Sequence, residues 1–483
     1  MAAKILFTHS YFYRLDKKQW QSQRPYPPYG TMLAAANCRD LGHEVALFDS
    51  GLQYGPEQIA PQLQEFQPDF LVIYDDSFNY LSKMCLSVMR DAALQMIAMA
   101  KAQGVRVLVS SSDATDHPEI YLQAGANLVM LGEADQTLRE LMQQGGHASV
   151  DCLGIAYLEN GALISTPRRP VLQDLDSIPA PAWDLVTLDD YRDIWMRAHG
   201  YFSLNIATTR GCPFKCNWCA KPIYGNRYHS RSPEKVVEEL SLLMIQYKAT
   251  HFWVSDDIFG LKPGWMDRFS ELLQERQLQP KFKIQCRADL LLKHSTVASL
   301  VKAGLDEVWI GAESGSQKIL DAMDKGITVD QIHQANTLLT SMGVKVCLFI
   351  QYGYLDEQKE DILKTLEMIK AIDPHDIGIS VSYPLPGTGF YEKVKLLMQE
   401  KQNWQDSNDL ETLYSTQFSK AFYKQLHLYT HYCFKNWKSG KAIMRHLIKT
   451  KSPNQLAKQL LLFHHSLAHR CLSRIKLAYY QLQ

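Results

Sequence analysis

The chain has 483 residues, a length that corresponds to about three domains of ordinary size. Apolar residues make up 46% and charged residues 21% of the chain, which excludes a disordered polypeptide. Lys and Arg together number 51, as do Asp and Glu, so the chain is neither basic nor acidic as a whole. Ten cysteines are too few for a disulfide scaffold, and we find neither a signal peptide nor the roughly 18 consecutive apolar residues of a membrane span. We therefore expect a cytoplasmic protein.

Residues 1–145 alternate short apolar runs with amphipathic segments. The runs predict strands at 4–10, 43–49, 68–76, 105–112 and 126–133, and the segments predict helices at 29–42, 90–104 and 135–144. This alternation is typical of an α/β domain with a doubly wound, Rossmann-like parallel sheet. Such sheets bind ligands at the carboxyl ends of their strands, which places a site in the loops after Thr8, Asp49, Asp75 and Ser110.

Residues 146–200 differ in composition from the segments on either side. Asn160-Gly161 is a strong signal for a two-residue turn, and it predicts a small hairpin. Residues 174–186 are rich in proline and acidic side chains, which indicates a linker. We expect a domain boundary in this segment.

Residues 201–395 return to alternating strands and helices. Strands are predicted at 203–211, 251–257, 281–286, 307–313, 345–353 and 376–386, with helices between them. Six such units predict a partial (β/α)6 barrel whose chemistry takes place at the carboxyl ends of the strands. Residues 396–483 show helical patterns and no strand pattern, and we expect them to form a helical C-terminal extension.

A cysteine motif lies directly after the first predicted barrel strand. Cys212, Cys216 and Cys219 have the spacing Cys-x3-Cys-x2-Cys, and three thiolates this close together converge on one metal centre. Structural zinc needs a fourth ligand, for which His229 is available. A 4Fe-4S cluster held by three cysteines instead leaves one iron open to an outside ligand. Because no second cysteine pair follows, the motif favours the iron–sulfur cluster.

This loop, with Trp218 before its last cysteine, resembles the cluster-binding signature of the radical S-adenosylmethionine enzymes. In that family S-adenosylmethionine chelates the open iron through its amino and carboxylate groups. Reduction then yields methionine and a 5′-deoxyadenosyl radical, which abstracts hydrogen from a substrate. The resemblance implies that Cys212, Cys216 and Cys219 bind the cluster, and that an external donor of flavodoxin or ferredoxin type supplies the electron.

Polar residues at the second and third strand ends extend the resemblance. Residues 252–259 are similar to the second-strand segment of the cobalamin-dependent branch of the family. There an acidic pair stands where other branches place a Gly-Gly-Glu turn that receives the amino group of S-adenosylmethionine. This assigns Asp256 and Asp257 to the cosubstrate, with capping of the next helix as the alternative. Arg287 presents a planar fork that suits the cosubstrate carboxylate, with an ordinary salt bridge as the alternative.

Two later strand ends resemble the same branch. Residues 311–315 are similar to its ribose-side strand, and Glu313 and Ser314 are able to bond ribose hydroxyls. Residues 383–388 resemble the last-strand loop near the adenine, which assigns Pro386 to the cosubstrate. A rigid Pro-Gly turn is an alternative role for that loop, and the two roles are compatible.

The N-terminal segment resembles the cobalamin-binding domain of this branch, at residues 27–31, 42–45 and 131–133. The resemblance covers residues 1 to about 395 and implies a corrinoid between the sheet and the barrel mouth. Two features depart from it. The Asp-x-His-x-x-Gly motif that ligates cobalt is absent, and residues 110–113 read Ser-Ser-Ser-Asp where relatives carry a glycine pair. Either the corrinoid is held differently here or the domain is retained as a scaffold without cofactor, and of the two we expect cobalamin binding.

The C-terminal extension accounts for the neutral total charge. Residues 401–483 contain 13 Lys or Arg and 3 Asp or Glu, with no acid after Glu411, so this tail carries +10 and the remainder −10. Aromatic side chains are interleaved with the cations. A solvated helical cap, or a peripheral contact with anionic lipid or another anionic ligand, fits this composition. No RNA-binding motif accompanies the charge, which disfavours nucleic acid.

Together these features predict a radical S-adenosylmethionine enzyme, most simply a cobalamin-dependent methyltransferase that acts on an unactivated carbon. The substrate would be a small molecule or a peptide. The alternative is a radical oxidation, cyclisation or rearrangement without methyl transfer, including ring formation on a tetrapyrrole. A non-catalytic corrinoid or iron–sulfur scaffold is a third option, which the intact three-cysteine loop disfavours.

Overall fold

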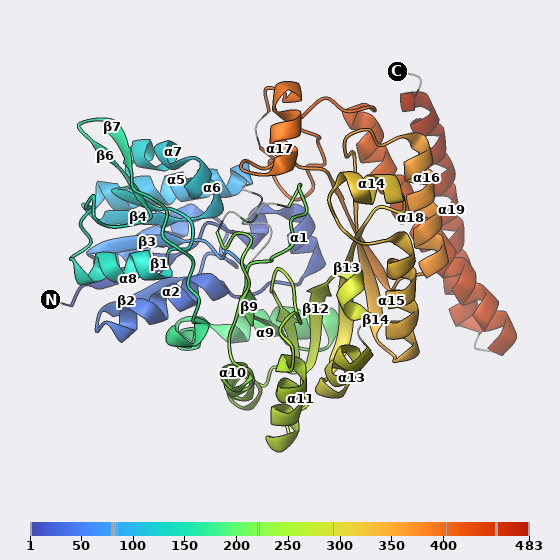
Figure 1. Ribbon diagram of the computed structural model, residues 1–483, viewed down its shortest axis with the longest axis horizontal. Helices are drawn as coiled ribbons and strands as arrows, with labels where there is room; N and C mark the ends of the chain where they lie inside the picture. Colours follow the sequence, from blue (N-terminus) through green and yellow to red (C-terminus); the bar gives the residue numbers. More distant parts are fainter. Residues whose placement is uncertain are drawn as a thin grey trace.

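The molecule, a computed structural model, contains two sheets side by side and a pair of long C-terminal helices (Figure 1). The structure describes residues 2–78, 84, 86–219, 221, 223–292, 294–401, 403–449 and 453–481. The N-terminal sheet and its helices form one side of the molecule, the second sheet forms the other, and the helix pair covers the outer flank of the second sheet.

The N-terminal sheet has seven strands in the order β2-β1-β3-β4-β5-β6-β7. Its strands are β1 (Lys4–Thr8), β2 (Glu44–Phe48), β3 (Phe70–Tyr74), β4 (Arg106–Ser110), β5 (Leu128–Met130), β6 (Ile155–Glu159) and β7 (Ala162–Ser165). The first five are parallel, as predicted. All five residues of β3 are buried, because helices cover both faces of the sheet.

The helices of this half are α1 (Lys17–Ser22), α2 (Tyr29–Asp40), α3 (Ala60–Phe66), α5 (Ser87–Ala102), α6 (Ser112–Asp116), α7 (Pro118–Ala124) and α8 (Asp135–Gln143). Apolar side chains of α3, α5 and α7 form one core with the sheet, whereas those of α2 and α8 belong to a second core. The sheet is therefore doubly wound, which confirms the predicted fold class.

The predicted hairpin at Asn160-Gly161 is present, but it extends the N-terminal sheet instead of standing in a linker. Strand β6 pairs antiparallel with β5, and Met130 lies opposite Ile155. The following segment also contains a helix that we did not predict, α9 (Leu188–His199). Leu188, Tyr191 and Trp195 are buried at helical spacing on one face of α9, while the rest of its surface is mainly charged, with both acidic and basic side chains.

The second sheet has six parallel strands in the order β15-β14-β13-β12-β11-β8. They are β8 (Ser203–Ile206), β11 (His251–Val254), β12 (Lys281–Cys286), β13 (Leu305–Glu313), β14 (Lys345–Tyr352) and β15 (Asp376–Val381). Strands β8 and β15 are the two edges, so the sheet is the predicted partial barrel. Alternate residues face the helices, and the residues between them face the enclosed side of the barrel.

The helices around this sheet are α10 (Pro233–Gln246), α11 (Trp265–Glu275), α12 (Ala288–Leu291), α13 (His294–Ala303), α14 (Gln317–Ala322), α15 (Val329–Ser341), α16 (Lys359–Ile372) and α17 (Gly389–Val394). Short 3-10 helices occur at η1 (Tyr13–Leu15), η2 (Pro56–Ile59), η3 (Leu175–Ser177), η4 (Trp183–Leu185) and η5 (Lys395–Leu397).

The extension ends in two long helices, α18 (Lys420–Lys449) and α19 (Pro453–Gln481). Helix α18 packs against α16 and the edge strand β15, and α19 packs on the outer side of α18 (Figure 1). Among the helices that the structure describes, none has both the length and the apolarity needed to cross a membrane.

Candidate active site

The three cysteines lie in one loop that is closed at its base by a two-stranded ribbon. Strand β9 (Thr209–Arg210) pairs antiparallel with β10 (His229–Ser230), so residues 211–228 form the loop between them. Gly211 stands at the start of the loop with a φ of +77°, and a Cβ there would collide with the carbonyl oxygen of Arg227. Glycine is thus required where the chain leaves the ribbon.

The three thiols interact with one another inside this loop. Cys212 is buried, whereas Cys216 and Cys219 are half-buried. Burial raises the pKa of Cys219 to about 12, and the nearby Cys216 and Cys212 add to the rise. Within the described part of the chain, no three His, Cys, Asp or Glu side chains converge tightly enough to hold one metal ion. His229, the candidate fourth zinc ligand, stands in β10 opposite Arg210.

The donor set fits an iron–sulfur cluster better than a single ion. Three cysteines that each bind a different iron of a cluster stand farther apart than three ligands of one metal ion. Sulfur is also the ligand that iron–sulfur clusters require, and all three sulfurs lie in a loop of 18 residues. The residues present are therefore suited to a cluster.

Cationic side chains from two barrel loops approach Cys216. The Nη1 of Arg287 lies 3.8 Å from the sulfur of Cys216, and the guanidinium stacks 3.8 Å from the ring centre of Phe214. The same Nη1 donates to the carbonyl of Lys325, while Nε and Nη2 donate to Asp289 and Nη2 also to the carbonyl of Gly326. Arg287 therefore contacts the cysteine loop, and its guanidinium group is already hydrogen-bonded to other parts of the barrel.

Glu313 and Lys325 form a buried ion pair beside the same sulfur. The Nζ of Lys325 lies 2.7 Å from Oε1 of Glu313, and both side chains are less than one tenth exposed. Burial by itself would lower the pKa of Lys325, but Glu313 and Cys216 hold it above its usual value. Glu313 also has a φ of +58°, a conformation that non-glycine residues adopt mainly where function or packing imposes it.

The predicted acidic pair divides into two environments. The carboxylate of Asp256 accepts hydrogen bonds from the backbone N–H groups of Thr208 and Thr209, at 2.7 and 3.0 Å, and from the Thr208 hydroxyl. Burial raises the pKa of Asp256 to about 6, although these hydrogen bonds oppose the rise. Asp256 thus ties the end of β11 to the start of the cysteine loop. Asp257 is half-buried and close enough to Cys212 and Cys219 to raise the pKa of both thiols.

Ser314, the other residue predicted on the ribose side, lies deeper in the fold. Its side chain is fully buried, and its hydroxyl lies 3.2 Å from the Thr365 hydroxyl of helix α16 and accepts a hydrogen bond from the N–H of Ser316. Pro386, by contrast, is exposed in the loop after β15, as a rim residue would be.

Asn217 was not singled out from the sequence, yet it docks the cysteine loop onto three barrel loops. Its amide nitrogen donates to the Ala322 carbonyl and to Asp324, at 2.8 and 2.7 Å, and its amide oxygen accepts from the Tyr354 hydroxyl at 2.7 Å. Its carbonyl accepts from the N–H of Phe390 at 2.8 Å. The sequence motif shows an asparagine between two cysteines, but it does not reveal this role, because the partners of Asn217 are more than 100 residues away in the chain.

The last-strand loop reaches the cysteine loop through aromatic rings. The rings of Trp218 and Tyr383 are 5.8 Å apart in an edge-to-face arrangement, and Tyr383 has the same relation to Trp404. The described barrel end therefore joins the cysteine motif to the loop that contains Pro386 and to the C-terminal extension.

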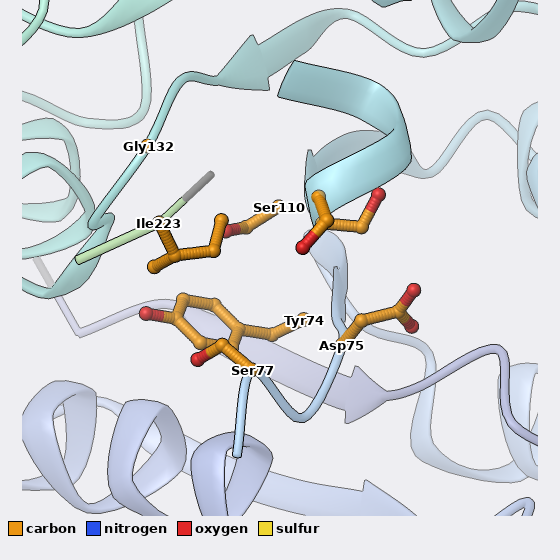
Figure 2. Close-up of a pocket in the computed structure, with 8 residues that line it drawn as sticks. Tyr74, Asp75, Ser77, Ser110, Gly132 and Ile223 are labelled. Atoms are coloured by element: carbon orange, nitrogen blue, oxygen red, sulfur yellow. The ribbon is translucent and has the colours of Figure 1, made fainter. Parts of the chain in front are cut away.

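A small pocket lies at the carboxyl ends of the N-terminal strands, where the sequence predicted a ligand (Figure 2). Tyr74, Asp75 and Ser110 come from the ends of β3 and β4, and Gly132 from the loop after β5. Ile223 closes the pocket from the cysteine loop. The pocket thus lies between the N-terminal sheet and the loop that bears the three thiols.

The residues around this pocket bond mainly to one another. Asp75 accepts from both the N–H and the hydroxyl of Ser10, at 2.7 and 2.8 Å. The Ser111 hydroxyl accepts from the N–H of Ala114 and caps helix α6, and Asp113 pairs with Arg90. The Ser-Ser-Ser-Asp sequence therefore builds the start of α6. In this arrangement the pocket is smaller than a corrinoid. For a corrinoid to bind here, the residues that line the pocket would have to move apart.

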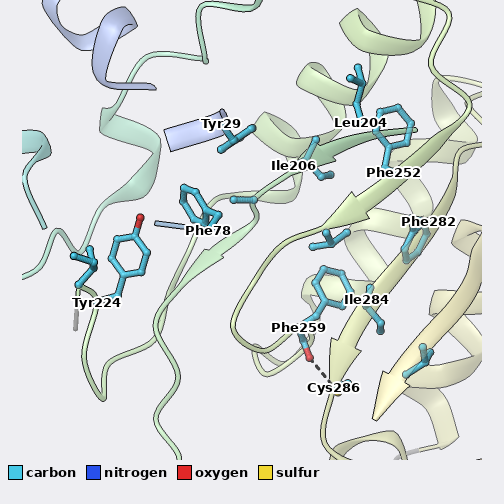
Figure 3. Packing of buried hydrophobic residues seen from close by; sticks show 14 of the residues in the cluster. Tyr29, Phe78, Leu204, Ile206, Tyr224, Phe252, Phe259, Phe282, Ile284 and Cys286 are labelled. Atoms are coloured by element: carbon cyan, nitrogen blue, oxygen red, sulfur yellow. Dashed lines mark hydrogen bonds between the residues drawn. The ribbon is translucent and has the colours of Figure 1, made fainter. Parts of the chain in front are cut away.

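The two halves of the molecule are joined beside this pocket by charge and by packing. Arg210, at the base of the cysteine loop, bonds to Asp135 and Glu133 after β5, and all three side chains are buried. Tyr29 and Phe78 of the N-terminal half pack edge to face at 5.4 Å, and Phe78 also contacts Tyr224 of the cysteine loop (Figure 3). One core therefore runs from the N-terminal sheet to β8, β11 and β12 of the barrel.

The enclosed side of the barrel carries a polar residue that the sequence did not reveal. Gln351, near the end of β14, is 1% exposed, yet neither atom of its amide has a hydrogen-bond partner in the described part of the chain. It follows Phe349 on the same face, where Phe349 stacks on Trp309 at 4.6 Å. A buried amide without partners is costly unless a bound group supplies them.

Comparisons with known proteins agree with this arrangement. Residues 206–369 match the model of the Radical SAM superfamily. An uncharacterized methyltransferase of Pyrococcus horikoshii is 28% identical over 375 residues, which are 76% of this chain and 78% of that protein. The anaerobic magnesium-protoporphyrin IX monomethyl ester cyclase of Rubrivivax gelatinosus is 28% identical over 326 residues, or 65% of this chain and 58% of the cyclase.

A solved structure shares the whole architecture. The cobalamin-dependent S-adenosylmethionine radical enzyme OxsB, with aqua-cobalamin and S-adenosylmethionine bound, aligns with a TM-score of 0.73 and 18% identity, over 98% of this chain and 72% of OxsB. At this identity the similarity shows the fold. Residues 206–369 therefore carry a Radical SAM superfamily domain, and the chain as a whole shares the fold of OxsB.

Proposed function

We propose that the protein uses S-adenosylmethionine and a 4Fe-4S cluster to start a radical reaction, and that the reaction transfers a methyl group to an unactivated carbon with the help of cobalamin. One observation carries the proposal. The pocket at the N-terminal strand ends is closed by Ile223, which belongs to the same loop as Cys212, Cys216 and Cys219. Groups bound at the two places would therefore be neighbours.

Cys212, Cys216 and Cys219 would hold the cluster. When bound, the cluster and S-adenosylmethionine supply a 5′-deoxyadenosyl radical. The chain's own contribution is to position and shield. Asp256 would fix the chain just before the cysteine loop, Asn217 would anchor the loop between Cys216 and Cys219, and Arg287 would place a positive charge next to Cys216.

The cosubstrate would lie across the strand ends of the barrel. Asp257 offers a carboxylate to the cosubstrate amino group, and Glu313 offers a carboxylate to ribose hydroxyls while Lys325 holds it in place. Arg287 is engaged with Asp289 and two carbonyls, so its role toward the cosubstrate carboxylate would be shared with those partners. Pro386 would border the adenine on the exposed side.

The substrate would be a small molecule or peptide that enters the enclosed side of the barrel, where Gln351 would meet a polar group. A flavodoxin- or ferredoxin-type protein would deliver the electron. Cobalamin would bind at the N-terminal strand ends, in the space between Gly132 and Asp75, once the pocket has opened.

A second function is favoured by the size of that pocket. Because so small a pocket does not enclose a corrinoid, the N-terminal sheet could serve as a scaffold, while the barrel carries out a radical oxidation, cyclisation or rearrangement. The similarity to a tetrapyrrole cyclase agrees with this alternative.

Anaerobic reconstitution tests the proposal. The protein, supplied with iron, sulfide, excess cobalamin, dithionite and S-adenosylmethionine, is expected to form 5′-deoxyadenosine and to retain corrinoid after gel filtration, as measured by its absorbance spectrum. The Cys216→Ala variant is the control. Equal 5′-deoxyadenosine from both proteins would overturn the radical reaction, whereas loss of corrinoid with retained cleavage would favour the second function.

A further inference from the structure

The outermost helix of the molecule, α19, exposes apolar side chains on the face that points away from the rest of the protein. Ser466, Ser473 and Leu477 are buried, and Asn436 of α18 donates to the Ser466 hydroxyl at 3.4 Å, so this face of α19 meets α18. The opposite face has no protein layer over it in the described part of the chain (Figure 1).

The apolar stripe consists of Leu461, Ala468, Leu472 and Ile475. Their separations of seven, four and three residues place them on one side of a helix. Leu461 is 73%, Leu472 57% and Ile475 67% exposed. Leu460 and Leu462, beside the stripe, are 38% and 47% exposed. Exposed apolar side chains that gather on one helix indicate an interaction surface.

The charge around the apolar stripe has a single sign. Residues 420–481 contain 12 Lys or Arg and no Asp or Glu. Lys438 and Lys441 are paired with Asp373 of the barrel, but Arg474 and Lys476 are exposed on α19 itself. A partner of this surface must therefore be apolar in part and anionic in part.

We propose that α19 docks the protein onto an anionic lipid surface, lying flat with the apolar stripe in the interface. An amphipathic helix with cations at its flanks binds bilayers in this way. Since no helix among the described residues has the apolarity to cross a bilayer, the contact is peripheral. A second copy of the same face fits less well, because each copy would bring only positive charge to the interface.

Co-sedimentation of the full chain with vesicles tests this docking. Vesicles of phosphatidylcholine with about one third phosphatidylserine are expected to bind the protein at least roughly tenfold more tightly than pure phosphatidylcholine. High salt should remove most of this preference. The triple variant Leu461→Ser/Leu472→Ser/Ile475→Ser should reduce binding to anionic vesicles by roughly tenfold or more.

The double variant Leu396→Ser/Ile245→Ser is the matched control, because these side chains are 93% and 62% exposed at η5 and α10. It should bind vesicles like the unaltered protein, and all variants should keep the same circular dichroism spectrum and melting temperature. Equal binding to both vesicle types, or a triple variant that binds normally, would overturn the proposal. It would also be overturned if the protein dimerises in solution and the triple variant is monomeric.

Discussion

The guanidinium of Arg210 donates to both carboxylate oxygens of Asp135, at 2.8 and 3.2 Å, across the junction between the barrel and the N-terminal sheet. Burial by itself would lower the pKa of Arg210, but Asp135, with Tyr224 and Glu133, holds it well above its usual value. Arg210 directly precedes Gly211 and Cys212. The ion pair therefore fixes the base of the cysteine loop relative to the pocket of the N-terminal sheet.

Arg210→Gln should destabilise the protein strongly, since it leaves the buried carboxylates of Asp135 and Glu133 without their cation. Breaking a buried pair costs roughly 3 kcal/mol or more. Urea unfolding of the metal-free protein measures the loss. Arg39→Gln is the matched control, because the Arg39–Asp184 pair is exposed and should contribute less than about 1 kcal/mol. Equal losses in both variants would contradict this account.

Asn217→Leu should reduce both the iron content and the 5′-deoxyadenosine yield after reconstitution. The variant keeps the cysteines but removes the hydrogen bonds to Ala322, Asp324 and Tyr354 that dock the loop on the barrel. Misplacement of the loop should lower the yield by roughly tenfold. Tyr354→Phe removes one of these bonds and should have a smaller effect. Full iron content and yield in Asn217→Leu would show that the loop needs no such anchor.

Lys325→Met should destabilise the metal-free protein by roughly 3 kcal/mol, because it leaves Glu313 buried without its partner. The double variant Glu313→Gln/Lys325→Met should recover much of that loss, since it also removes the buried charge. Binding of S-adenosylmethionine, measured by equilibrium dialysis, should remain weak in the double variant if Glu313 contacts the ribose. Additive losses in the double variant would contradict the coupling of the two side chains.

Glu357 should make the stability of the protein depend on pH. Burial raises its pKa from 4.5 to about 8, and one of its oxygens accepts from the N–H of Gly353 at 2.7 Å. The folded protein favours the protonated carboxyl. The stability that Glu357 contributes is therefore fully present below 4.5, its pKa in the unfolded chain, and is lost as pH rises to about 8, its pKa in the folded protein. Relative to Glu357→Gln, the unfolding free energy should fall by roughly 1.4 kcal/mol per pH unit between about pH 5 and 8. Parallel pH curves for the two proteins would contradict this.

Gln351→Leu should raise the free energy of unfolding of the unliganded protein and should weaken the binding of any ligand that hydrogen-bonds to the Gln351 amide. In the described structure the Gln351 amide has no partner, so replacing it removes a burial cost of roughly 1 kcal/mol. If S-adenosylmethionine or the substrate supplies the partner, its affinity should fall in the same variant. Asn205→Leu is the comparison, because Asn205 donates to the Pro27 carbonyl at 3.1 Å and its loss should destabilise. Lower stability in Gln351→Leu would indicate a structural role.

The alternation of strands and helices was readable from the sequence because buried parallel strands and amphipathic helices have distinct periods of apolar residues. The five parallel N-terminal strands and the six barrel strands were predicted for this reason. Helix α9 was missed, since its apolar residues Leu188, Tyr191 and Trp195 are spread among acidic side chains. The hairpin was predicted, but its pairing with β5 was not, because strand pairing is a contact between distant segments.

The part of the site that the sequence by itself determined is the cysteine motif. Its spacing is local, and metal binding is a property of the cysteine side chain. The same holds for the family resemblance, which the barrel match confirms. Only the tertiary structure decided the roles of Asp256, Ser314, Asn217 and Arg210. Each of these side chains either acts on a partner remote in sequence or is withdrawn from the site by one. Hydrogen bonds and ion pairs between distant segments depend on how the strands and loops pack, and a single sequence read along its length does not contain those distances.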